Sequence, residues 1–203
     1  MRSGLCLAAV ALSAIGFAVF DPASAGTRME TAAPAVPPAG FLGFCLKHLP
    51  DCTGRTSGGG VELTPERLRL LQSVQAQVNA AIAPCEDPTH SWDYPTDGTG
   101  DCNRYALEKR RELIERGWPR GSALLATAIT ETGEDHLVVV ARTDRGDLVL
   151  DNRVAPVVDW AELPYRWISI QSDRSPVQWL SVVSSPAAAG GTSTPRRAPS
   201  AAR

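Results

Sequence analysis

The sequence predicts an α+β domain in which two helices precede an antiparallel β-sheet. Apolar residues recur at helical spacing after Thr64, and a second helical segment follows Asp101. Beyond Gly117 the period changes, because short β-branched or Leu-rich runs alternate with turns. Helices followed by a series of strands favour an α+β layout over a parallel α/β one. The 203 residues suffice for one domain of ordinary size.

The bulk composition is that of a globular protein, and it excludes few classes of function. The sequence is 43% hydrophobic and 21% charged, with a net charge of -2. This balance gives no reason to expect nucleic acid or an anionic membrane surface as a partner.

The first 25 residues have the features of a signal peptide. A basic start is followed by an apolar run and by the small-residue cleavage pattern Ala23-Ser24-Ala25. A membrane-spanning helix needs about 20 apolar residues, and this run is shorter, so we expect cleavage and no stable membrane insertion afterwards. The sequence therefore predicts a periplasmic or secreted protein. Its expected parts are a signal peptide (1–25), a flexible lead (26–40), the folded domain (41–184) and a disordered tail (185–203).

Four cysteines remain after removal of the signal peptide, and in an oxidising compartment they allow three pairings. Cys45 and Cys52 are near enough in sequence to close one short loop. Cys85 and Cys102 then either form a second disulfide or leave Cys102 as a free thiol. No C-x-x-C pair is present and the three histidines are scattered, so a zinc site is not expected.

Two helices and five strands are predicted along the domain. Thr64 as N-cap with Pro65 after it begins a helix over 65–82, and Asp101 caps a second helix that runs to Arg116. Gly117 ends that helix. The expected strands are 123–130, 136–142, 148–150, 167–170 and 179–183.

Cys102 is the first candidate for chemistry. As the residue after an N-cap it lies at the positive end of a helix, where unsatisfied amides and the macrodipole favour a thiolate over a thiol. A cysteine nucleophile requires that environment, and the neighbouring N–H groups suit an oxyanion. A disulfide or an inert buried thiol is the structural alternative.

His136 and Asp151 are candidates because of their position in a hairpin. If Asp144-Arg145 forms a two-residue loop, Asp151 faces Val138 and lies diagonal to His136 on the same face. Diagonal neighbours are about 7 Å apart at the backbone, which permits an Asp–His hydrogen bond. Such a carboxylate orients the imidazole and stabilises its charged form.

Several motifs resemble those of the bacterial transglutaminase-like cysteine proteinase family. They are Gly100-Asp101-Cys102, the run from Tyr105 to Arg110, His136-Leu137-Val138, the strand motif from Gly146 to Asn152, Trp160, Tyr165 and Gln171-Ser172. The resemblance spans about residues 38–180. It implies a papain/transglutaminase-type core with Cys102 as nucleophile, His136 as general base and acid, and Asp151 as its orienter. The implied reaction is acyl transfer through a thioester, and the implied partner is a protein substrate such as a cell-surface protein.

Calcium is a further implication of the resemblance. Characterised relatives include calcium-dependent proteases that carry extra acidic residues around the nucleophile, where this sequence has Asn103-Arg104. An amide and a cation suit a hard divalent ion less well than two carboxylates. Asp93, Asp97 and Asp101 still offer oxygens, so calcium is the one candidate cofactor.

Three functions remain open from the sequence. The preferred one is an exported cysteine peptidase with a Cys102–His136–Asp151 triad. A transglutaminase or amidase would use the same triad with a different acceptor or substrate. A non-catalytic binding module would hold Cys102 in a disulfide with Cys85.

Overall fold

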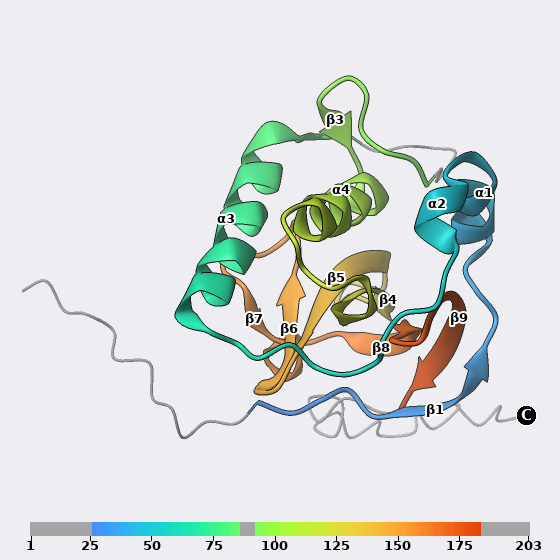
Figure 1. The fold of residues 1–203 in the computed structure, drawn as a ribbon. Coiled ribbons are helices and arrows are strands. Elements are labelled where there is room, and N and C mark those ends of the chain that lie inside the picture. Colours follow the sequence, from blue (N-terminus) through green and yellow to red (C-terminus); the bar gives the residue numbers. More distant parts are fainter. Residues whose placement is uncertain (1–25, 86–91, 184–203) are drawn as a thin grey trace, which may run out of the picture.

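The computed structural model describes residues 26–85 and 92–183 (Figure 1). The expected signal peptide and C-terminal tail lie outside the described residues. The helices are α1 (Ala39–Lys47), α2 (Leu49–Cys52), α3 (Pro65–Ala81) and α4 (Cys102–Glu115), with two 3₁₀ turns at Arg120–Ser122 and Trp160–Glu162. The strands are β1 (Thr31–Ala35), β2 (Ala83–Pro84), β3 (Thr99–Gly100), β4 (Ala123–Ile129), β5 (Asp135–Thr143), β6 (Gly146–Leu150), β7 (Val158–Asp159), β8 (Arg166–Ser172) and β9 (Ser175–Val182).

Seven of the strands form one antiparallel sheet in the order β1-β9-β8-β4-β5-β6-β7, while β2 and β3 form a separate parallel pair. Helix α4 packs on β4 and β5, α3 packs against α4, and α2 contacts β9. The predicted α+β arrangement of helices before an antiparallel sheet is therefore confirmed. In the part of the chain described here, no helix has both the length and the apolar character needed to cross a membrane.

The sheet separates two apolar clusters, as the alternation of side chains along β5 requires. Leu137 and Val139 belong to the cluster beneath the helices, together with Leu71 and Val74 of α3. Val138 belongs to the cluster on the opposite face, where Trp160 and Trp167 also pack. Since β5 is covered on both faces, its position is fixed relative to α4.

Local capping signals place the two long helices where the sequence predicts them. The Thr64 hydroxyl accepts from Arg67 N at the start of α3. The Asp101 carboxylate accepts from the N–H groups of Asn103 and Arg104 at the start of α4. After α4 the chain turns at Gly117, whose φ of +88° favours glycine.

The N-terminal region differs from the sequence prediction. Residues 26–40 were expected to be a flexible lead, but Thr31–Ala35 forms β1 and pairs with β9 at the edge of the sheet. The strand shows no alternation of buried and exposed residues, because four of its five residues are exposed. Pro34 is tolerated because the strand is at an edge of the sheet. Backbone pairing with a distant strand produces β1, and local sequence does not reveal such pairing.

The segment after β1 contains the two short helices α1 and α2. The disulfide between Cys45 of α1 and Cys52 of α2 joins them, as predicted. Just before α4 begins, Thr99–Gly100 pairs with Ala83–Pro84. This pairing ties the start of α4 to the end of α3.

Candidate active site

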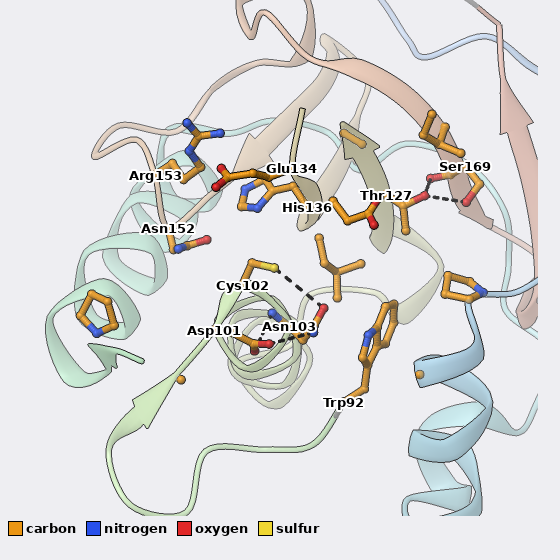
Figure 2. Close-up of a pocket in the computed structure, with 18 of the residues that line it drawn as sticks. Trp92, Asp101, Cys102, Asn103, Thr127, Glu134, His136, Asn152, Arg153 and Ser169 are labelled. Atoms are coloured by element: carbon orange, nitrogen blue, oxygen red, sulfur yellow. Dashed lines mark hydrogen bonds between the residues drawn. The ribbon is translucent and has the colours of Figure 1, made fainter. Parts of the chain in front are cut away.

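A cleft of about 1110 Å³ opens beside the first turn of α4 and the beginning of β5 (Figure 2). Its walls come from segments that are distant in sequence. They include Cys102 and Asn103 of α4, His136 of β5, and Asn152 and Arg153 after β6. The remaining lining residues are Val36, Pro38, Gly40, Pro84, Cys85, Trp92, Gly100, Asp101, Thr127, Ala128, Glu134, Asp135, Leu137, Ile168 and Ser169.

Cys102 is the first residue of α4 and its side chain lines this cleft. Its thiol is not part of a disulfide, so the predicted alternative in which Cys102 is bonded to Cys85 is wrong for this structure. The sulfur lies 3.9 Å from Asn103 Oδ1. The setting at a helix start is the one that the sequence predicts.

His136 and Asp151 are joined by a hydrogen bond, with 2.8 Å between His136 Nε2 and Asp151 Oδ1. The β5–β6 hairpin pairs Val139 with Leu150 and Thr143 with Gly146, so the two-residue loop predicted at Asp144-Arg145 is present. Extended by one position beyond the Val139–Leu150 pair, this register would set Asp151 opposite Val138 and diagonal to His136.

Both residues are removed from solvent, with exposed fractions of 7% for His136 and 1% for Asp151. Burial alone would lower the pKa of His136. The hydrogen bonds of His136 to Asp151 and Cys102, and the charges of those two groups, outweigh the effect of burial. They raise the pKa of His136 to about 9. Burial would likewise raise the pKa of Asp151, but its hydrogen bonds and the His136 charge lower it. The site therefore favours a protonated His136 beside the Asp151 carboxylate.

Asp151 is held by several groups that the reasoning from residue types did not identify. Its Oδ1 also accepts from Arg153 N at 2.9 Å, and its Oδ2 accepts from the Tyr165 hydroxyl at 2.7 Å. Its backbone oxygen accepts from Gln75 Nε2 at 2.7 Å and Asn79 Nδ2 at 3.2 Å, both from α3.

Two of these partners of Asp151, Tyr165 and Gln75, stand out in the sequence. Tyr165 belongs to the family motifs, although no role follows from that alone. Gln75 is a polar residue beside Val74 and Val78 on the buried stripe of α3. A buried polar residue on an apolar helix face needs a hydrogen-bond partner, and here that partner is the backbone of Asp151.

The three candidate calcium carboxylates do not come together. Asp93 pairs with Lys47 and with His48, at 2.9 and 2.7 Å. Asp97 accepts from the backbone and hydroxyl of Thr99, while Asp101 caps α4. Within residues 26–85 and 92–183, no group of three or more His, Cys, Asp or Glu side chains is arranged to hold a metal. These residues do not fit a calcium site.

Comparisons with solved structures concern the fold. The chain superposes on the calcium-bound structure of Legionella pneumophila LapG with a TM-score of 0.51 and 21% identity, over 62% of this chain and 75% of that one. The EGTA-treated LapG structure gives a TM-score of 0.48 at 22% identity, over 59% and 69%. A third LapG structure gives 0.49 at 22% identity, over 59% and 71%. The calcium-bound structure supports a shared fold. No curated protein matches the sequence.

A family model extends the comparison to the sequence itself. The model described as bacterial transglutaminase-like cysteine proteinase matches residues 31–186, which include β1 and all three candidate site residues. The protein thus belongs to the bacterial transglutaminase-like cysteine proteinase family and is a cysteine peptidase.

Proposed function

We propose that this cysteine peptidase is exported and hydrolyses a protein substrate through a thioester. In this proposal Cys102 is the nucleophile, His136 the general acid and base, and Asp151 the residue that orients the imidazole. The observation that carries the proposal is the position of His136. Its Nε2 lies 2.8 Å from Asp151 Oδ1, so the other ring nitrogen is available to the Cys102 thiol.

Acylation begins from the thiolate–imidazolium pair. The Cys102 sulfur attacks the peptide carbonyl carbon, and the new S–C bond gives a tetrahedral intermediate whose oxygen carries the negative charge. This intermediate collapses to the thioester as the C–N bond breaks. His136 donates its proton to the departing amine. Water then attacks the thioester, and the neutral imidazole accepts the water proton. The C–S bond breaks, the carboxylic product leaves, and the thiolate–imidazolium pair is restored.

The start of α4 suits the negative charge that develops on the carbonyl oxygen. Asp101 Oδ1 accepts from Asn103 N at 3.1 Å and Arg104 N at 3.2 Å, so the cap uses these two amides. The N–H of Cys102 precedes them at the positive end of the helix. In the proposal this N–H stabilises the oxyanion.

The size of the cleft and the composition of its walls favour a polypeptide substrate. At about 1110 Å³ it exceeds the volume of a usual small-molecule pocket. Exposed Val36 and Ile168 offer apolar contact, while Glu134 and Asp135 carry negative charge. We infer an extended segment of a protein as substrate, and export would bring the enzyme to proteins of the cell surface.

Export is proposed from the signal-peptide pattern of residues 1–25. The Cys45–Cys52 disulfide supports it, since disulfides persist in oxidising compartments. Expression of the full chain, cell fractionation and N-terminal sequencing test this proposal. We expect a periplasmic or secreted protein that begins at Gly26, and an intact Met1 in the cytoplasm would contradict it.

Two histidine variants and one cysteine variant test the catalytic proposal. Cys102→Ala and His136→Gln are expected to lose cleavage of a denatured protein such as reduced casein. His48→Gln is the matched control, because His48 also contacts a carboxylate, Asp93, at 2.7 Å but lies outside the cleft. Retained cleavage in Cys102→Ala, or equal loss in His48→Gln, would overturn the assignment.

A further inference from the structure

Lys109 lies in the interior of the domain, in the helix that begins with Cys102. The two residues are seven positions apart, which is about two helical turns, so they share one side of α4. Its side chain has an exposed fraction of 0% and is among the largest fully buried side chains of the described residues. A buried lysine is unusual, because lysine is almost never fully buried unless it is paired.

The Lys109 amino group has no conventional hydrogen-bond partner. Among the described residues no acceptor lies within hydrogen-bonding reach of Nζ. The amino group lies over the face of Tyr105, whose ring centroid is 5.8 Å from Nζ. A buried ammonium without a hydrogen-bonded partner costs free energy of folding, so packing alone does not account for a lysine here.

Lys109 shares its side of α4 with Cys102, and α4 packs on β5, the strand that carries His136. Asp151, which follows β6, favours the charged form of Lys109 and opposes the lowering of its pKa. The imidazole of His136, from β5, and the hydroxyl of Tyr165, before β8, are bonded to that same carboxylate. Helix α4 itself supplies Cys102 and Tyr105.

Helix α3 contributes two side-chain amides to the polar groups near Asp151. Gln75 and Asn79 both donate to the backbone oxygen of Asp151, and their own side-chain oxygens have no partner among the described residues. The polar groups between α3, α4 and the sheet thus converge on Asp151. Burial lowers the pKa of Lys109 to about 7, although the Asp151 charge opposes this shift.

We propose that Lys109 is a positioning residue for the peptidase reaction: its buried amino group balances the charge of Asp151, and through it that of the His136–Cys102 pair. The inference rests on the proposed function. A thiolate, an imidazolium and a carboxylate sum to one negative charge in a buried site, and a protonated Lys109 makes that sum zero. Removing this cation disfavours the thiolate.

The first test is Lys109→Met, which keeps the apolar stem and removes the amino group. Iodoacetamide alkylation of native protein is followed from pH 4 to 9, with the modified cysteine identified by peptide mapping. The midpoint for Cys102 is expected to move to higher pH by roughly half to one pH unit. The melting temperature is measured alongside, so that an effect on the thiol midpoint is separated from an effect on stability. Lys47→Met, at an exposed lysine, is the control and is expected to leave the midpoint unchanged.

The outcomes separate this inference from the proposed function. If Cys102 in the unaltered protein reacts only as an ordinary thiol, with a midpoint near pH 8.5, the proposed function fails. If Cys102 reacts at lower pH and Lys109→Met has the same midpoint, the inference about Lys109 alone fails. A lower melting temperature with an unchanged midpoint indicates a purely structural lysine and also overturns it.

A second test observes Lys109 directly. Lys47 and Lys109 are the only lysines of the sequence, so ¹³C-lysine labelling gives two sets of side-chain NMR signals. Asp151→Asn removes the charge that favours protonated Lys109, and the Lys109 signal is expected to titrate at lower pH while the Lys47 signal does not move. Identical Lys109 titrations in both proteins would show that the two residues are not coupled.

Discussion

Asp151 Oδ1 lies 2.8 Å from His136 Nε2, although fifteen positions separate the two residues in sequence. The contact follows from the register of one hairpin, since pairing of Thr143 with Gly146 fixes every later pair of β5 and β6. A one-residue slip would move Asp151 to the other face. The two-residue loop at Asp144-Arg145 therefore determines whether the imidazole is oriented.

Asp151→Asn tests how much the Asp151 carboxylate contributes to catalysis. The amide is close to isosteric but uncharged, so the pKa of His136 is expected to fall from about 9 towards its ordinary value. We expect kcat/KM for a protein substrate to fall by about two to four orders of magnitude. Asp93→Asn, which alters the partner of His48, is the control and is expected to retain activity. A small loss shared by both variants would argue against a catalytic role for Asp151.

Tyr165→Phe removes the hydroxyl that donates to Asp151 Oδ2. The ring can still pack against His136, whose centroid is 5.6 Å away, but one oxygen of a buried carboxylate loses its partner. We expect a destabilisation of about 1–3 kcal/mol, measured by urea unfolding, and a lower kcat at pH 7.

Tyr94→Phe is the matched control for this variant. It removes a hydroxyl that donates to Asp51 Oδ2 at 3.0 Å, away from the cleft. Its stability is expected to fall while kcat is retained. An equal effect of the two substitutions on kcat would mean that Tyr165 acts on stability alone.

The features that sequence predicted well depend on local chemistry. Asp101 caps α4 through amides two and three residues later, so Cys102 is placed at a helix start by its immediate neighbours. The His136–Asp151 pair follows from a short turn and the two-residue period of strands. Both signals fall within a single helix start or hairpin.

The features that sequence did not predict depend on distant contacts. β1 forms because its backbone pairs with β9, with Thr31 opposite Val182, and exposed side chains around Pro34 carry no strand pattern. Asp93 was a candidate metal ligand from residue type alone, yet it pairs with Lys47 and His48 of a separate helical segment. Composition near the nucleophile does not reveal which acidic side chains already have a partner.

Chelation tests whether catalysis needs calcium. One LapG structure is described as calcium-bound, but in this chain Asp101 is engaged in capping α4, and Asn103 and Arg104 follow the nucleophile. A neutral amide and a cation there suit a hard divalent ion less well than two carboxylates would. We expect cleavage by the purified enzyme to be unchanged after EGTA treatment and unchanged on addition of calcium. Loss with EGTA that calcium restores would show that a metal site exists despite this donor set.

Stability is expected to depend on pH through the buried His136–Asp151 pair. The pKa of His136 is raised above its unfolded value of about 6.5, so its contribution is complete below that pH and is lost as pH rises through about 9. The pKa of Asp151 is lowered, so its contribution is present above about pH 4 and is lost as pH falls through its folded pKa.

Lys109 acts with the opposite sign, because a lowered lysine pKa makes stability rise as pH increases from about 7 to about 10. The contribution of His136 is therefore best isolated as the difference in unfolding free energy between the protein and its His136→Gln variant. This difference is expected to shrink between about pH 6.5 and 9, by at most about 1.4 kcal/mol per pH unit. Urea unfolding at half-unit intervals measures it. A difference that stays constant over this range would mean that His136 is not held as an imidazolium by Asp151 and Cys102.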